Sequence, residues 1–149
     1  MMKKIILLII LFLGGTFSYS SLVTPLPNTP MFDNIIAPDG DNGYSIVTYP
    51  GGSTAIIVEM TARNIITKTQ VKAIAHAFGV SFEWPIPNVG HHTNLPYNIG
   101  DRIKLAITLY FNESIPPTVF DLDLVVTDQN QEAIGGGRFT IDILDLSNY

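Results

Sequence analysis

Several short patterns in the chain contain residue types that can do catalysis, but each lacks a residue that the chemistry needs. Residues 51–55 follow the start of the G-x-S-x-G pattern that presents a nucleophilic serine, and its last glycine is missing. Asp121 and Asp123 are carboxylates two residues apart, which is typical of an exposed strand face and not of an acid pair in a cleft. We therefore expect no catalytic residues and no enzymatic activity.

The patterns that could bind metals are also incomplete. Residues 39–43 resemble the start of a calcium loop, but Pro50 stands where the loop needs its glutamate at position twelve. His91 and His92 are adjacent and His76 is the one other histidine, so the spacings expected of a zinc site are absent. We expect turns at these positions, with no metal and no cofactor.

One modification pattern is complete. Asn112, Glu113 and Ser114 form an N-glycosylation sequon between two predicted strands. We expect this segment to lie on the surface and Asn112 to be glycosylated in a eukaryotic secretory pathway.

The elements that position these residues are predicted to be strands. Residues 103–111, 120–126 and 139–143 alternate apolar and polar side chains, as strands with one face on a core do. Shorter runs predict further strands at residues 44–49, 54–60, 70–78 and 80–87. Propensity alone would also allow a helix at 70–78, but Gly79 and the flanking strands favour β-structure.

Seven or eight short strands with Gly and Pro at their connections predict an all-β fold. The expected architecture is an immunoglobulin-like, two-sheet antiparallel sandwich. Residues 135–137 are three glycines, which predict a bulge or a close approach between strands. Residues 21–43 predict an irregular N-terminal segment with one edge strand, and residues 44–146 form the expected domain.

The N-terminus has the pattern of a cleavable signal peptide over residues 1–20. Lys3 and Lys4 precede an apolar run at residues 5–13, which is too short for the roughly 20 residues of a membrane-spanning helix. Small residues follow, and cleavage after Ser18 or Ser20 fits them. We expect a secreted protein.

Charge and cysteine content restrict the function further. The chain has 8 basic and 13 acidic residues, and loss of Lys3 and Lys4 changes its net charge from −5 to −7. Nucleic acid binding needs a basic face, so it is not expected. There is no cysteine, so packing and hydrogen bonds must stabilise the fold without disulfides.

Two segments resemble the ML lipid-recognition domain, the family of the Niemann-Pick type C sterol carrier and the phosphatidylglycerol/phosphatidylinositol transfer proteins. The first is FGVSFEWPIP at residues 78–87, followed by a loop and LPYNIG at 95–100. The second runs from Ile115 through the strands at 119–127 and 134–143. Leu95 and Gly136 stand at or near positions where the family has cysteines, so its disulfides are missing here.

The resemblance implies a monomeric carrier, secreted or endolysosomal, that holds a sterol or phospholipid acyl chain between its sheets and contacts membranes transiently. It places Trp84 at the cavity mouth, Phe111 on a lining strand, and Ile115 with Pro116 at the entrance loop. The interior lining would be Phe82, Leu109, Phe120, Leu122 and Leu124. Candidates for contacts to the ligand's polar end are Lys104, His91, His92, Tyr97 and Tyr110.

A second hypothesis is an immunoglobulin-like protein-interaction module without a lipid cavity. Inward Phe, Leu and Ile side chains pack the core of any sandwich, and Trp84 would then be an ordinary core aromatic. The missing cysteines favour this alternative. An apolar pocket of about 300–1,000 Å³ would favour the carrier, and a contiguous exposed apolar patch would favour the module.

Overall fold

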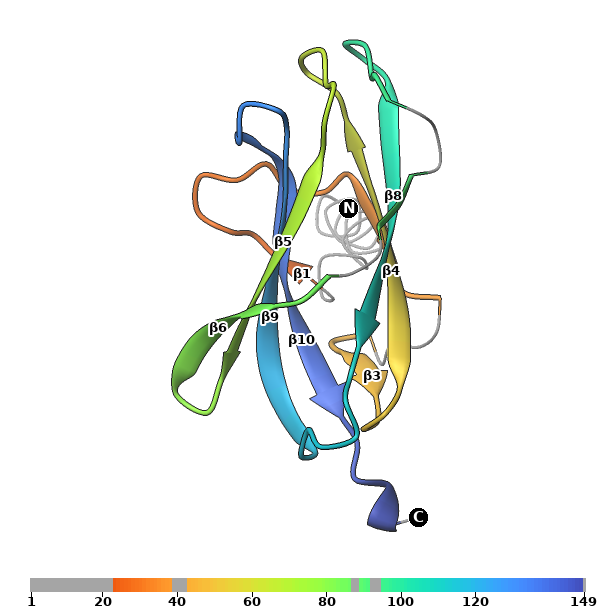
Figure 1. Cartoon of the computed structure of the whole chain (residues 1–149), viewed down its shortest axis with the longest axis vertical. Helices are drawn as coiled ribbons and strands as arrows, with labels where there is room; N and C mark the ends of the chain where they lie inside the picture. Colours follow the sequence, from red (N-terminus) through yellow and green to blue (C-terminus); the bar gives the residue numbers. More distant parts are fainter. Residues whose placement is uncertain (1–22, 39–42, 87–88, 92–94, 149) are drawn as a thin grey trace, which may run out of the picture.

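The computed structural model describes residues 23–38, 43–86, 89–91 and 95–148, and within them two β-sheets face each other (Figure 1). The predicted signal peptide lies outside the described residues. Within these ranges, no helix is long and apolar enough to cross a membrane. The one helical segment in the described residues is a 3-10 turn at Leu146–Asn148.

The first sheet has the strand order β1-β10-β9-β5-β6, with β3 pairing in parallel to β10. The second sheet has the order β2-β4-β8-β7. The first sheet comprises β1 (Val23–Thr24), β3 (Ile46–Thr48), β5 (Gln70–Ala77), β6 (Val80–Trp84), β9 (Thr118–Thr127) and β10 (Ala133–Ile143). The second comprises β2 (Asn34–Ile36), β4 (Ser53–Thr61), β7 (Val89–His91) and β8 (Arg102–Tyr110).

The core lies between the inner faces of the two sheets. Side chains alternate along β8 and β9, so every second residue of each strand is buried. The resulting single cluster contains Ile103, Leu105, Ile107, Leu109, Phe120, Leu122, Leu124 and Val126 among its members. The expected all-β, immunoglobulin-like sandwich is confirmed.

Several local predictions can be compared with the strands. Residues 70–77 form β5, so the ambiguous stretch is a strand and not a helix. The N-terminal segment supplies two short strands, β1 and β2, where one was expected, and β7 lies in the expected loop after Trp84. Strands of two or three residues have too few positions for a period-two pattern to show.

The three consecutive glycines allow the close approach that the sequence predicted. The β9–β10 register shifts between Ala133 and Gly135, which marks a bulge. A Cβ atom on Gly136 would lie 2.9 Å from the carbonyl oxygen of Leu124 and 2.7 Å from Thr29 Cγ2. A larger residue at this position would therefore force the strand away from its neighbours.

Candidate functional site

Trp84, the last residue of β6, joins the two sheets near one end of the sandwich. Its ring centroid lies 5.5 Å from those of Phe120 on β9 and Phe111 just after β8, and 6.1 Å from that of Phe82. Trp84 is 8% exposed, and its ring stacks on Phe120 with an interplanar angle of 26°. Such aromatic packing fixes the rings relative to one another.

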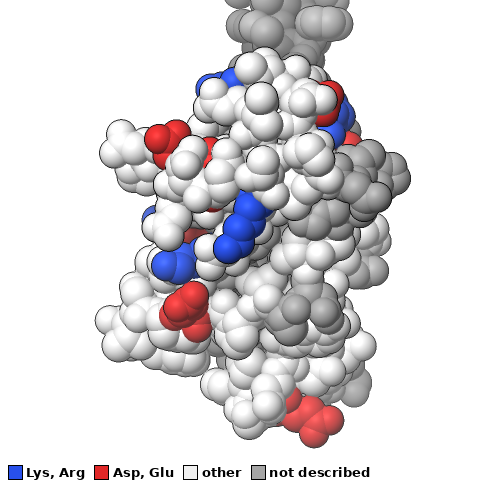
Figure 2. Space-filling view, turned by 45° about the horizontal axis from the view of Figure 1, so that its top comes forward, with Lys and Arg blue, Asp and Glu red and all other residues white. Residues whose placement is uncertain are grey.

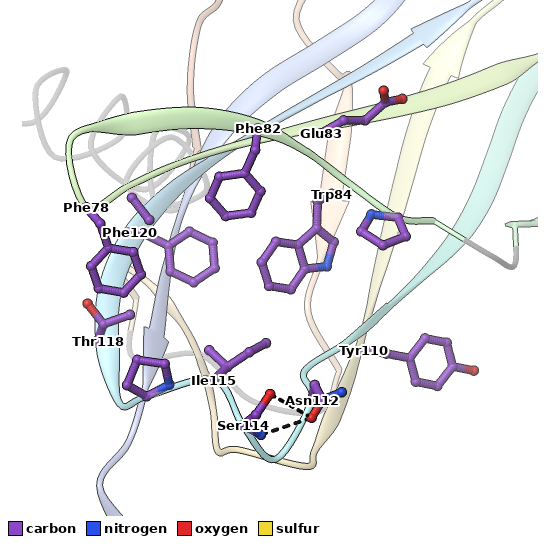
Figure 3. A pocket seen from close by; sticks show the side chains of 13 residues that line it. Phe78, Phe82, Glu83, Trp84, Tyr110, Asn112, Ser114, Ile115, Thr118 and Phe120 are labelled. Carbon is purple, nitrogen blue, oxygen red and sulfur yellow. Dashed lines mark hydrogen bonds between the residues drawn. The ribbon is translucent and has the colours of Figure 1, made fainter.

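A half-open pocket of about 430 Å³ lies on the outer side of this aromatic cluster (Figure 3). In Figure 3, the side chains of Phe82, Trp84, Ile115 and Phe120 point toward one another around the hollow, while the Glu83 carboxylate points away. The complete lining is Ala77, Phe78, Phe82, Glu83, Trp84, Pro85, Tyr110, Asn112, Ser114, Ile115, Pro116, Thr118 and Phe120.

One wall of the pocket is the β5–β6 hairpin, which projects at the lower left of Figure 1. Ala77 pairs with Val80, so the turn consists of Phe78 (φ 55°) and Gly79 (φ 75°). Two positive φ angles define the tight turn that usually has Asn-Gly. A bulky residue in the left-handed region costs about 1 kcal/mol, so Phe78 is strained yet 70% exposed at the pocket. Strain of this kind gathers at functional sites.

The opposite wall is the loop between β8 and β9. The Asn112 side-chain oxygen accepts hydrogen bonds from the backbone N–H of Ser114 at 2.9 Å and from its hydroxyl at 3.1 Å. The backbone of Phe111 exchanges hydrogen bonds with Gly51 and Gly52 at 2.7 and 2.9 Å, which anchors the loop to the start of β4. Ile115 and Pro116 are thereby held at the mouth of the pocket.

The predicted lining residues divide into two groups in the structure. Trp84, Phe82, Ile115, Pro116 and Phe120 come together around the pocket. Phe82 is 41% exposed, so it lies at the mouth and not in the interior. The remaining four are buried in the packed core. Phe111 packs against the Trp84 ring. Leu109, Leu122 and Leu124 lie deeper between the sheets.

The candidates for contact with a polar ligand group are also separated. Tyr110 lines the pocket, whereas Tyr97 is buried and Lys104 Nζ lies 3.9 Å from a Glu59 carboxylate oxygen. His91 belongs to β7, and His92 lies outside the described residues.

Phe78 was missed as a lining residue. The available signal was the Phe-Gly dipeptide between two strands, which places an exposed aromatic at a two-residue turn.

The outer face of the first sheet carries a polar network. His76 Nε2 lies 2.8 Å from Asp123 Oδ2, and its Nδ1 lies 2.7 Å from Ser81 Oγ. Arg138 donates to both Asp123 oxygens at 2.6 and 3.0 Å. Burial raises the pKa of Asp123, but the hydrogen bonds from Arg138 and His76 outweigh burial and hold that pKa below its usual range.

This Ser-His-Asp arrangement serves as a tie between strands. The Arg138 guanidinium neutralises Asp123, and Ser81 lies on the face opposite the neighbouring pocket residue Phe82. The network joins β5, β6, β9 and β10, so it holds the pocket-bearing hairpin to the sheet. Among the residues that the structure describes, no three His, Cys, Asp or Glu side chains gather as a metal site would require.

Comparisons with known proteins give a fold likeness. No protein-family model matches the chain, and no curated protein matches it in sequence. Among solved structures, a Niemann-Pick type C2 protein from the Japanese carpenter ant superposes with a TM-score of 0.66 at 14% identity, over 78% of this chain and 93% of that one.

Two further structures match less well. A family 123 glycoside hydrolase from Clostridium perfringens gives a TM-score of 0.44 at 13% identity, over 67% of this chain and 22% of that one. A PapD-like domain of human CEP192 gives 0.33 at 13% identity, over 82% of this chain and 91% of that one. The two-sheet sandwich described above is therefore similar in fold to a Niemann-Pick type C2 protein.

Proposed function

We propose that this protein binds a lipid in the pocket beside Trp84 and transfers it between membranes. The observation that carries the proposal is the half-open pocket of about 430 Å³ whose walls are mainly aromatic and aliphatic. Its volume lies within the range of about 300–1,000 Å³ usual for small-molecule sites. An apolar chain gains about 25 cal/mol for each Å² removed from water, so such walls favour a sterol or an acyl chain.

The packing behind the pocket limits how deep a ligand reaches. Leu109, Leu122 and Leu124 have no surface that water can reach. A ligand in the described pocket therefore stops at the ring of Trp84, and its remainder extends toward the mouth. Phe82 is the half-exposed member of the aromatic cluster, so it lies where a larger ligand would extend out of the pocket.

The mouth suits transient contact with a membrane. Phe78 and Val80 lie exposed on the hairpin, and Tyr110 is half exposed on the opposite side of the pocket. Exposed apolar side chains around an apolar pocket let a lipid leave a bilayer without crossing water. We further propose that the protein acts as a secreted or endolysosomal monomer.

A vesicle transfer assay tests this function. Donor vesicles carry a fluorescent sterol or a fluorescent phospholipid, and the protein's effect on transfer to acceptor vesicles is measured. Ile115→Asp puts a carboxylate into the lining and is expected to slow transfer at least tenfold. Val119→Asp is the matched control, because Val119 is exposed and does not line the pocket.

Either of two results would contradict the carrier. Wild-type protein could fail to accelerate transfer of both lipids, or Ile115→Asp and Val119→Asp could have equal effects. Circular dichroism of both variants shows whether they are folded.

The interaction module is the second candidate, and the exposure of β6 favours it. Four of the five residues of β6 are exposed, and the strand forms an edge of its sheet. An exposed edge with apolar side chains can pair with a strand of another protein. Under this alternative, substitutions at Val80 abolish partner binding, and the pocket stays empty when lipid is supplied.

A further inference from the structure

The rim of the pocket carries uncharged polar groups, and this restricts the polar end of the ligand. We propose that the site selects lipids whose polar end is uncharged and bears an acceptor oxygen, such as a hydroxyl or an ester carbonyl, over anionic lipids. The inference rests on the proposed lipid-binding function and adds the class of lipid.

Asn112 supplies the donor. Its side-chain oxygen is identified by the backbone N–H of Ser114, which can only donate and lies 2.9 Å away. The Nδ2 amino group must therefore be the other end of the amide, and among the described residues it has no hydrogen-bond partner. Asn112 lines the pocket (Figure 3), so an N–H donor is held at the rim by the turn around Ser114. A ligand oxygen there would accept from it.

No cation of the described residues lines the pocket. Lys104 precedes Tyr110 by six strand residues, or about 20 Å, and Lys72 precedes Ala77 by five, or about 16 Å. Arg138 is engaged with Asp123 on the outer face. These separations exceed the Debye length of about 8 Å at physiological salt, so the two lysines are screened from the mouth.

The remaining basic side chains lie near the far end of the sandwich. Arg63 and Lys68 belong to the β4–β5 connection, and Arg102 begins β8. Figure 2 brings this end forward and shows basic side chains there, interspersed with acidic ones. A phosphate or carboxylate at the pocket would therefore have no positive partner among the residues that the structure describes.

The charges that do flank the pocket are negative. Glu83 is part of the lining, and Glu113 lies beside Asn112 in an adjoining hollow that the two residues share with Tyr110. The Glu83 carboxylate points away from the hollow (Figure 3) and Glu113 lies in the adjoining one, so both add negative charge near the mouth without facing a ligand directly. An anionic lipid would gain no compensating contact from the described residues, whereas an uncharged lipid gains the hydrogen bond from Asn112.

One set of mixed vesicles tests the selection. Phosphatidylcholine vesicles containing equal amounts of cholesterol, diacylglycerol and phosphatidylglycerol are incubated with the mature protein, which is re-isolated and extracted. Because all probes share one membrane, its surface charge affects them equally. We expect cholesterol and diacylglycerol to exceed phosphatidylglycerol at least tenfold. Equal or greater recovery of phosphatidylglycerol would overturn the proposal, and recovery of no lipid would instead refute the proposed function.

Asn112→Asp replaces the donor by an oxygen while keeping the acceptor for Ser114. We expect recovery of the uncharged lipids to fall about tenfold in protein made in bacteria, where no glycan is added. Asn64→Asp makes the same amide-to-carboxylate change at an exposed residue that does not line the pocket, so it serves as the control. Unchanged recovery with Asn112→Asp would overturn the role of the donor.

Glu83→Lys tests the charge argument, and Glu132→Lys is its control with the same change in net charge away from the pocket. We expect Glu83→Lys alone to raise recovery of phosphatidylglycerol at least threefold. An equal rise in both variants, or in neither, would overturn the argument from local charge.

Discussion

Replacing Phe78 by Asn should stabilise the fold and impair the function at the same time. Phe78 adopts φ 55° and precedes Gly79 at φ 75° in the β5–β6 turn. Asn tolerates the left-handed region far better than a bulky aromatic residue, and Asn-Gly is the preferred pair for this turn. We expect a gain of about 0.5–1 kcal/mol in the free energy of unfolding, which raises Tm by a few degrees.

The functional cost follows from the exposure of Phe78. The side chain is 70% exposed, and lipid or membrane would cover part of that surface. If half of it is covered, about 60 Å² leave water, which is about 1.5 kcal/mol or roughly tenfold in affinity. Asn forfeits this contribution because its amide is polar.

Differential scanning calorimetry and the vesicle transfer assay measure the two effects. Ile99→Asn is the matched control, since Ile99 is 68% exposed but does not line the pocket. It is expected to change neither quantity appreciably. A lower Tm for Phe78→Asn would refute the argument from strain, and an unchanged transfer rate would refute the role of Phe78 at the mouth.

Three further results are expected. Trp84→Ala should cost about 3–5 kcal/mol in urea unfolding because it leaves a cavity between three aromatic rings; a cost below about 1 kcal/mol would contradict the described packing. The lowered pKa of Asp123 contributes stability that is present above its ordinary pKa of 3.8 and is lost as pH falls through the lowered value. Arg138→Gln should therefore reduce the drop in Tm between pH 5 and pH 2.5, and an unchanged drop would contradict this reasoning. Gly136→Ala should lower the free energy of unfolding by about 1–3 kcal/mol because its Cβ would meet a backbone carbonyl of β9. The control Gly90→Ala makes ordinary contacts only and should change it by no more than about 0.5 kcal/mol, so equal losses would contradict the close approach.

The fold could be predicted where side chains alternate over a long strand. Residues 103–111 and 120–126 show a period of two because one face packs on the core and the other faces solvent. β1 and β2 have two and three residues, which is too short for that signal. Their pairing depends on distant partners, such as Phe139 for Val23, which no local pattern reveals.

The candidate site could be predicted in part. Trp84 and Ile115 line the pocket as the family resemblance implied, but the resemblance did not distinguish pocket from core on the same strand. Phe120 reaches the pocket whereas Leu122, two residues along, is fully buried. This difference depends on where the opposite sheet ends, which is a tertiary property. The rim donor of Asn112 likewise depends on the turn with Ser114.

Native mass spectrometry of the mature protein, secreted from its own cells, tests the central claim most directly. Anything bound is then extracted and identified, and the empty protein is offered lipid vesicles. We expect one lipid per chain, lost in Ile115→Asp and retained in Val119→Asp. A folded protein that carries no lipid and takes up none from vesicles would contradict the lipid-binding account.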